Sequence, residues 1–426
     1  MSSLTLHPGF TQPEALTLPE GWVAKKLACL TTNRQGGKLG LTKESHYVSN
    51  GVPAFSAAGC DGFVEEAEYK ETEAVVLSAI GANCGRCFFA SGNWTTLANV
   101  QAIIPNAEVD PKYLFYRVNQ ENFWERSGSA QPFIKPSSIG NSWVAFPQSK
   151  ARQKKIATIL TSIDTAIEKT EALIAKYQQI KAGLMHDLFT RGVLPNGQLR
   201  PSREQAPELY QETAIGWIPR EWESINLGRY IEVNLYGPRF DASDYNEAGN
   251  VKTIRGTDFS KDGEIKYSQA PVARLSPQKI KHHVLKSGDV VVVTTADCGL
   301  TAVFEDQDFC YIPSAYAVKY RFSSSVNPYF IKYFMQTDMA KRQVNKYVRQ
   351  GTLGNLPGSD LLRFPLGLPL PNEQTAIVLR LDSIKIKLAT ELKILDKLNQ
   401  QKSGLMHDLL TGKVTVKVEE PEAVDG

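Results

Sequence analysis

The chain has 426 residues, of which 42% are apolar, and its 48 Lys and Arg against 45 Asp and Glu give a net charge of +3. This composition is typical of a soluble globular protein, and the length predicts two or more domains. The sequence has no apolar stretch of the ~18 residues that a membrane helix needs, no signal peptide in residues 1–12, and too few cysteines for a disulfide scaffold. We therefore expect a cytoplasmic protein, in which any basic surface is local.

The sequence repeats itself, and the repeated motifs occur in one order. An ordered set of echoes predicts two tandem copies of a single unit. The echoes are LPEGW at 18–22 with IPREW at 218–222, Asp-Gly at 61–62 and 262–263, VVL…ANCG at 75–85 with VVV…ADCG at 291–299, and GLMHDL at 183–188 and 404–409.

Each copy has a segment of mixed strand and turn signals followed by a long helical segment. The predicted division is a first globular domain at 1–150, a helix at 151–192, a linker at 193–217, a second globular domain at 218–370, a helix at 371–412 and an acidic tail at 413–426.

Within the globular segments, β-branched runs at 75–80 and 289–295 predict buried strands that end in tight turns. The two Asp-Gly pairs have hairpin-turn chemistry. Helical stretches are predicted at 111–126 and 328–348, and the second would place Arg342, Lys346 and Arg349 on one basic stripe.

A polar loop follows each of these helical stretches, at 127–135 and 350–356. Gly permits close backbone approach, and Gln or Asn side chains can bond the edge of an adenine. Taken alone, a plain polar loop explains this signal better. Local charge gives little further support, because the second globular segment is only slightly basic and the first is neutral.

The two long helical segments carry apolar residues in a four-three rhythm, from Ile156 to Leu188 and from Ile377 to Leu409. Such a heptad seam predicts that the two helices pack on each other as a coiled coil, although two ordinary core helices in separate domains remain the alternative. The seam is interrupted at matching places, by Thr170 and Lys181 in the first helix and by Glu391 and Lys402 in the second.

The usual catalytic signatures are absent from the sequence, which has no GxxxxGK[ST], GxGxxG or GxSxG motif. Cys84 and Cys87 form a lone CxxC pair, of which the second copy keeps only Cys298, so we expect no zinc site. The Glu-x-Lys spacing at 264–266 occurs in some metal nucleases but is expected by chance in a chain of this length. The sequence favours a binding protein over an enzyme.

These features, in this order, resemble the specificity subunits of type I restriction-modification enzymes. The resemblance covers roughly residues 15–415. It is carried by TAIGWIPREW at 213–222, IRGTDFS at 254–260 with GEI at 263–265, PLPNEQ at 369–374 and the segment 404–414. The first copy has PAFSAAG at 53–59 in place of the IRGTDFS motif, so its DNA contacts are less clearly marked.

The resemblance implies an α/β fold with two tandem target-recognition domains, separated by two long helices that form an antiparallel coiled coil with pseudo-two-fold symmetry. Each domain would read one half of a two-part, gapped DNA target, and the helices would set the gap. The chain itself would be non-catalytic and hold no cofactor or metal. It would bind double-stranded DNA, two methyltransferase subunits and restriction or translocase subunits, and these partners would use S-adenosylmethionine, ATP and Mg²⁺.

Candidate DNA-contacting residues are basic residues and the polar loop residues that the resemblance places next to DNA. They are Arg34, Lys38, Arg86, Ser129, Gln131 and Lys135 in the first copy, and Arg239, Arg255, Thr257, Arg342, Lys346, Arg349, Gln350, Thr352 and Asn355 in the second. The alternative from another class is a scaffold protein that carries two protein-binding modules on a coiled coil. A methyltransferase or nuclease with its own active site is disfavoured by the missing cofactor motifs.

Overall fold

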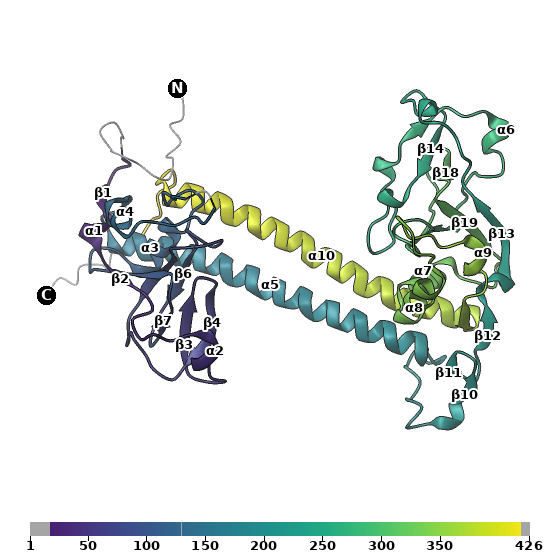
Figure 1. Ribbon diagram of the computed structural model, residues 1–426, viewed down its shortest axis with the longest axis horizontal. Coiled ribbons are helices and arrows are strands. Elements are labelled where there is room, and N and C mark those ends of the chain that lie inside the picture. Colours follow the sequence, from purple (N-terminus) through teal and green to yellow (C-terminus); the bar gives the residue numbers. More distant parts are fainter. Residues whose placement is uncertain (1–17, 129, 419–426) are drawn as a thin grey trace. The chain divides into compact units, whose positions relative to one another are not determined.

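A computed structural model describes residues 18–128 and 130–418, which form two units (Figure 1). Unit 1 is built from the chain up to Ala172 and again from Leu392, and unit 2 runs from Leu173 to Glu391. Each unit therefore contains part of both long helices, α5 (Lys150–Thr190) and α10 (Pro371–Leu410). No helix in the described part of the chain is long and apolar enough to cross a membrane.

Unit 1 contains a four-stranded antiparallel sheet, in which the fully buried β5 lies second from one edge and α3 packs on β5, β6 and β8. A smaller sheet has β3 antiparallel to β4 and parallel to β7, and β1 pairs with β9. The main sheet has the order β2 (Thr31–Gln35), β8 (Val100–Pro105), β5 (Ala74–Ser78), β6 (Cys87–Ala90). The other elements are β1 (Trp22–Lys26), α1 (Leu27–Leu30), α2 (Lys43–His46), β3 (Val52–Ser56), β4 (Gly59–Val64), β7 (Thr95–Thr96), α3 (Pro111–Val118), α4 (Pro136–Asn141) and β9 (Trp143–Pro147).

Unit 2 repeats this arrangement, with β16 in the place of β5 and α7 packed on β16 and β17. Its smaller sheet has β14 antiparallel to β15 and parallel to β18, and β12 pairs with β20. The main sheet has the order β13 (Ile231–Tyr236), β19 (Ala317–Phe322), β16 (Val290–Val293), β17 (Thr301–Val303). The other elements are β10 (Tyr210–Thr213), β11 (Gly216–Pro219), β12 (Glu223–Asn226), β14 (Val251–Ile254), β15 (Val272–Ala273), α6 (Pro277–Ile280), β18 (Tyr311–Pro313), α7 (Pro328–Gln336), α8 (Asp338–Tyr347), α9 (Gly358–Leu361), β20 (Pro365–Leu368) and five short 3₁₀ helices. The shared strand orders confirm the tandem repeat.

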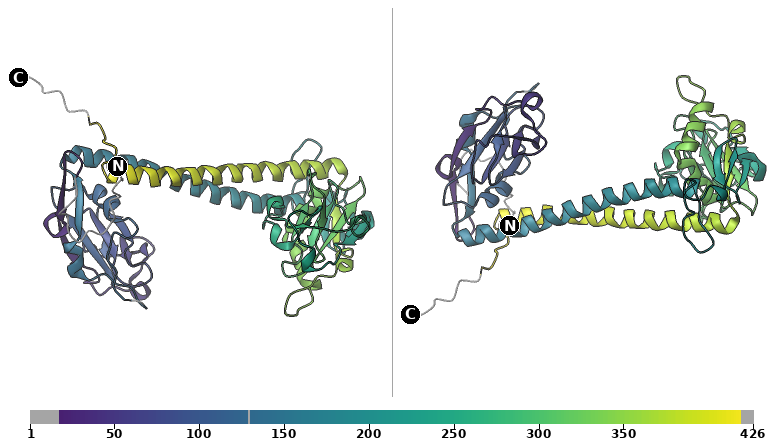
Figure 2. Two further views of the ribbon diagram at one scale, coloured as in Figure 1. Left: turned by 90° about the horizontal axis from the view of Figure 1, so that it is seen from above. Right: turned by 90° about the horizontal axis from the view of Figure 1, so that it is seen from below.

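The predicted seam is buried at both ends of each long helix and partly buried over most of the length of α10. In unit 1, Ile156 and Leu160 of α5 share a core with Leu409 near the end of α10. In unit 2, Leu188 near the end of α5 packs in one core with Ile377 of α10. The start of each helix thus meets the end of the other, and Figure 2 shows the two lying side by side. This confirms the antiparallel pairing.

Polar seam residues are accommodated by ion pairs and by the helix backbone. Lys402 Nζ lies 2.7 Å from Asp164 Oδ1 in unit 1, and Lys181 Nζ lies 3.0 Å from Asp262 Oδ1 in unit 2. Thr170 Oγ1 donates to the Ala166 carbonyl at 2.9 Å. The Lys402 pair joins α10 to α5 and favours one register of the two helices in unit 1, whereas Lys181 joins α5 to the turn at Asp262.

The repeated tryptophan motif closes each unit onto the end of a long helix. Gly192 and Gly412 end α5 and α10 with φ of +68° and +74°, a conformation that favours Gly. A Cβ at Gly192 would lie 2.6 Å from Trp222 Cζ2, and one at Gly412 would lie 2.8 Å from Trp22 Cε2. The helix-end and tryptophan echoes are therefore two sides of one contact.

The segment that joins the two copies is packed into unit 2. Arg200 is 2% exposed, its guanidinium pairs with Glu373 at the start of α10, and Tyr210 is buried at the start of the β10–β11 hairpin. This connection is an ordered part of the unit and holds α5 and α10 together where one ends and the other begins.

One of the two predicted Asp-Gly turns is wrong. Asp61 and Gly62 do not form a hairpin turn, because the turn between β3 and β4 lies at residues 57–58 and a β-bulge shifts the register at Ala54 and Phe55. The turn at Asp262 and Gly263 is confirmed, with Gly263 at φ +72°.

The predicted helical stretches are also shorter than expected. The first ends at Val118, and the second is divided into α7 and α8. The break falls at Thr337, whose hydroxyl accepts a hydrogen bond from the Ala340 N–H and caps α8.

Candidate nucleic-acid interface

Each unit carries the same set of five backbone hydrogen bonds at the end of its buried main-sheet strand. In unit 1, Ala79 N–H donates to the Asn99 carbonyl, and the Ala79 carbonyl accepts from Ile134 N–H, both at 2.9 Å. Gly81 N–H donates to Pro132 at 2.9 Å, and Ser127 and Phe133 exchange two bonds of 2.8 Å. We call this arrangement the strand-end frame of unit 1.

The strand-end frame of unit 2 reproduces all five bonds with different residues. Thr294 N–H donates to Tyr316 at 2.9 Å and the Thr294 carbonyl accepts from Leu356 N–H at 2.8 Å. Ala296 N–H donates to Gly354 at 3.0 Å, and Arg349 and Asn355 exchange bonds of 2.8 and 3.1 Å. Both predicted polar loops are thus tied to a strand from a distant part of the sequence.

The predicted loop residues lie on the surface at these frames. Gln131, Lys135, Gln350, Thr352 and Asn355 are all exposed. The candidate Ser129 lies outside the described residues. Neither Gln131 nor Gln350 takes part in the five backbone bonds of its frame.

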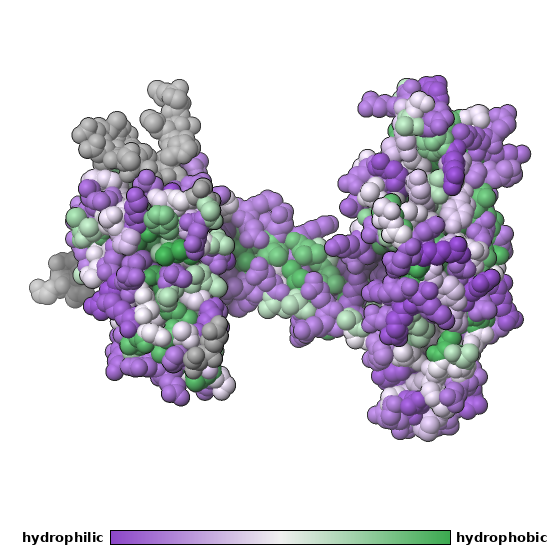
Figure 3. All heavy atoms as spheres, viewed as in Figure 1, coloured by the Kyte–Doolittle hydropathy of each residue, from purple (hydrophilic) through white to green (hydrophobic). Residues whose placement is uncertain are grey.

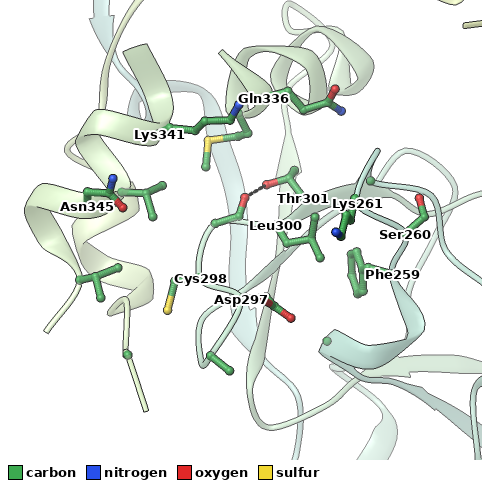
Figure 4. A pocket seen from close by; sticks show the side chains of 18 of the residues that line it. Phe259, Ser260, Lys261, Asp297, Cys298, Leu300, Thr301, Gln336, Lys341 and Asn345 are labelled. Atoms are coloured by element: carbon green, nitrogen blue, oxygen red, sulfur yellow. Dashed lines mark hydrogen bonds between the residues drawn. The ribbon is translucent and has the colours of Figure 1, made fainter. Parts of the chain in front are cut away.

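Unit 2 has a cavity of about 1010 Å³ beside its frame, between the 3₁₀ helix at 256–258, the turn at 296–299 and α8. Figure 4 shows Lys341 and Asn345 of α8 on one side and Ser260 and Lys261 on the other. Two predicted residues, Thr257 and Gln350, line it. Its polar lining supplies ammonium, amide and hydroxyl groups, which suit phosphate and base-edge oxygens, and the carboxylate of Asp297, which could accept a hydrogen bond from a base amino group.

Arg255 is held at the edge of this region by an almost fully buried carboxylate. Its Nη2 and Nε lie 2.9 and 3.2 Å from the two Asp258 oxygens, and Asp258 is 1% exposed. The hydrogen bond to Asp258 raises the pKa of Arg255, which burial alone would lower. The guanidinium is therefore fixed and charged, but two of its donors are already occupied.

The predicted basic stripe is only partly on one helix. Arg342 and Lys346 are exposed on α8, but α8 ends at Tyr347, so the prediction that Arg349 shares the helix is wrong. Arg349 instead stands at the base of the loop, where its Nη2 lies 3.8 Å from Asp360 Oδ2 and its side chain is 74% exposed.

The remaining candidates are exposed but less clearly grouped. Arg86 adjoins the frame of unit 1, since its carbonyl accepts a 2.8 Å bond from Ser78 N–H, and its guanidinium lies 5.7 Å from the Phe88 ring centre. Within the described residues, no side-chain hydrogen bond links Arg34, Lys38 or Arg239 to either frame.

Sequence reasoning missed several cationic and amide residues near the frames. Lys341 and Asn345 lie four residues apart on α8, a spacing that could have marked one helix face. Lys261 follows the Ser260 that the family motif contains. Arg126 directly precedes the loop of unit 1 and lies close to Gly85 in the turn.

Cys84 and Cys87 are part of the core of unit 1. Both thiols are buried, and Trp124 Nε1 donates to Cys87 Sγ at 3.4 Å. Burial raises the pKa of Cys87 to about 12, which keeps the thiol protonated and unreactive. Among residues 18–128 and 130–418, no group of three or more His, Cys, Asp or Glu could hold a metal ion.

Comparison with known proteins finds relatives over most of the sequence. The chain is 26% identical over 353 residues to the type I restriction enzyme MjaVIII specificity subunit of Methanocaldococcus jannaschii, covering 80% of this chain and 79% of that one. It is 25% identical over 337 residues to the putative MjaX specificity subunit of the same organism, covering 75% and 72%.

Solved structures show the fold over nearly the full length. The S subunit of a type I restriction-modification system from M. genitalium superposes with a TM-score of 0.59 at 13% identity, covering 97% of this chain and all of that one. A chain from a study of complex assembly and conformational transition of a type I system gives a TM-score of 0.50 at 15% identity, covering 94% of this chain and all of that one.

The family described as "Type I restriction modification DNA specificity domain" matches residues 19–179 and again 219–400. Each match includes one strand-end frame and most of the long helix that follows it. The function that this description gives the family is DNA specificity, that is, recognition of the DNA target. The chain therefore belongs to the type I restriction-modification DNA specificity family and carries two of its domains.

Proposed function

We propose that this chain reads a two-part DNA sequence, with each unit recognising one half and the paired helices setting the gap between them. The observation that carries the proposal is the strand-end frame, built twice with the same backbone bonds and bordered by basic and amide side chains. Lys and Arg would contact phosphates and supply affinity, while amide and hydroxyl groups would read base edges.

The partners we propose are two methyltransferase subunits and, with them, restriction or translocase subunits. Hydrophobic residues are exposed along the helical segments (Figure 3), and on α10 they include Leu379, Ile386, Leu392 and Ile394. Leu379 and Ile386 lie seven residues apart on one face of α10 in unit 2, and such exposed apolar side chains favour a protein partner there. S-adenosylmethionine, ATP and Mg²⁺ would be bound by these partners and not by this chain. A DNA ligand also implies a cytoplasmic location.

Adenine-methylation mapping tests the proposed function directly. The chain is expressed with the methyltransferase subunit of its own system in a host without DNA methylation, and the genome is sequenced by a method that detects methyladenine. A gapped two-part motif is expected only when the chain is present. If the two proteins co-purify and no new motif appears, the DNA-reading role is refuted, and the result favours the alternative of a scaffold protein with two protein-binding modules.

One phosphate contact is predicted at the base of the unit 2 loop. Arg349→Ala should weaken binding to all duplexes and lower the slope of log K against log salt by about 0.9, the value for one phosphate contact. The measurement is a salt titration of DNA affinity for the complex with the methyltransferase subunits. Arg363→Ala is the matched control, because Arg363 also pairs with Asp360, at 3.7 Å, and is 72% exposed. An unchanged slope for Arg349→Ala would remove this residue from the interface.

The helix pair is predicted to set the gap. One heptad inserted after Ala172 and one after Glu391 keep the seam in phase and lengthen both helices by about 10 Å, or about 3 base pairs. A shift of 3 base pairs also rotates the half-site by roughly a third of a turn. We expect methylation at the original gap to disappear and any new motif to have a longer gap. A heptad in α5 alone is the control that should disrupt the pairing, and an original gap retained by the double insertion would contradict the role of the helices.

A further inference from the structure

The two strand-end frames share their backbone bonding but differ in the side chains at matching positions. Residues 79 and 134 correspond to 294 and 356, and all four side chains are buried. Three other positions are at least partly exposed in both units. These three, which leave aside the positions that hold Gly or Pro in one unit and the Ser127 and Arg349 pair at the base of the loop, are Ile80, Asn99 and Phe133 in unit 1, and Thr295, Tyr316 and Asn355 in unit 2.

Backbone bonds to segments far away in the sequence hold each of these positions in place. Ile80 and Phe133 form an antiparallel bridge, and Thr295 and Asn355 form the same bridge in unit 2. Asn99 and Tyr316 each accept the N–H at the end of the buried strand through their carbonyl. A rigid backbone with varied outward side chains is the arrangement that a recognition surface needs.

We propose that these three positions determine which bases each unit reads. The inference rests on the proposed DNA-reading function and adds to it the residues and the kind of base. Because the frame is the same in both units, a difference in sequence preference between the two half-sites follows from the difference between the two sets of side chains.

In unit 1 the set is mainly apolar. Ile80 and Phe133 are neighbours on the bridge, and each is 37% exposed. In the major groove the apolar group that bases offer is the thymine methyl. Unit 1 is therefore assigned a half-site in which the bridge pair contacts at least one thymine methyl group.

In unit 2 the bridge pair is polar. Thr295 and Asn355 take the places of Ile80 and Phe133, and Tyr316 is 65% exposed beside them. An Asn amide can donate to and accept from the edge of adenine at the same time. Unit 2 is therefore assigned a half-site in which Asn355 reads an adenine, on the same surface as the cavity that Gln350 lines.

The first test replaces thymine by uracil in one half-site at a time, which removes only the methyl group. With the unmodified chain in complex with its methyltransferase subunits, affinity should fall about fourfold per contacted thymine in one half-site only. The Ile80→Ala and Phe133→Ala variants should abolish this difference. Phe63→Ala is the matched control, because Phe63 is 41% exposed in the same unit but lies outside the frame. A half-site of unit 1 without thymine, or a uracil effect that persists in both variants, would overturn the assignment.

The second test selects bound duplexes from pools in which one half-site is randomised and the other is kept. Asn355→Ala should lower the preference for adenine at one position about tenfold and leave the other half-site unchanged. Gln307→Ala removes an exposed amide outside the frame and should change nothing. Retained adenine preference in Asn355→Ala, or altered preference in both halves, would refute the inference. Failure of the unmodified complex to select any gapped sequence would instead refute the proposed function.

Discussion

Replacing Arg200 by Leu is expected to destabilise unit 2 by about 3–5 kcal/mol, which is the cost of leaving one member of a buried ion pair without its partner. The Arg200 side chain is 3% exposed and that of Glu373 is 10% exposed. Arg200 Nη1 lies 2.5 Å from Glu373 Oε1 and Nη2 lies 3.1 Å from Oε2. Burial lowers the pKa of Arg200, but the hydrogen bonds that its guanidinium donates to Glu373 and Glu221 outweigh this effect, so the net pKa is raised and the guanidinium stays charged.

The double variant Arg200→Leu with Glu373→Leu distinguishes the cost of an unpaired buried charge from the loss of the other contacts of the pair. It removes both charges, so it should recover much of the lost stability, with a remaining deficit of about 1–3 kcal/mol because Val193 N–H loses its 2.7 Å bond to Glu373. Arg203→Leu is the control, since Arg203 and its partner Glu204 are 45% and 73% exposed. Stability is measured by denaturant unfolding, with hydrogen exchange to locate the change in unit 2. If the free energy of unfolding of Arg200→Leu lies within about 1 kcal/mol of that of the unmodified chain, the stabilising role of the Arg200–Glu373 pair is contradicted.

The sequence predicted the long helices well because a heptad seam depends on local spacing alone. Each apolar position fixes which face of the helix is buried, and two helices with matching interruptions need few other contacts to define their pairing. The repeated Trp and Gly residues were visible as echoes, but their contact was not. It joins Trp22 to Gly412, and no local pattern relates residues so far apart.

The strand-end frames could not be predicted from residue types. Their bonds use backbone N–H and carbonyl groups, which every residue except Pro offers equally, and they join segments far apart in the sequence. The loops were found by their Gly, Gln and Asn content, whereas Ile80 and Phe133 read as ordinary strand and loop residues. The break at Thr337 was detectable, because Thr before Asp is a common start of a helix.

Gln153 and Gln374 make the same three hydrogen bonds at matching places in the interiors of the two units. Both side chains are fully buried near the start of their long helices. Gln153 accepts a 2.7 Å bond from Asp110 N–H and donates to Glu108 and Pro147 at 3.1 and 2.9 Å. Gln374 accepts a 2.7 Å bond from Asn327 N–H and donates to Ser325 and Pro369 at 3.0 and 2.8 Å. Each glutamine thus joins a long helix to the cap of α3 or α7.

Substituting either glutamine by Leu should cost about 3 kcal/mol or more, because one N–H and two carbonyl groups lose their partners in a buried site of nearly unchanged volume. Gln153→Leu should increase hydrogen exchange in unit 1, and Gln374→Leu should do so in unit 2. The controls are Gln401→Leu in unit 1 and Gln178→Leu in unit 2, two exposed glutamines of the same helices that should change stability by less than about 0.5 kcal/mol. Equal effects of Gln153→Leu on both units would show that the units do not unfold separately. Small effects like those of the controls would show that these buried bonds do not anchor the recognition units to the helices.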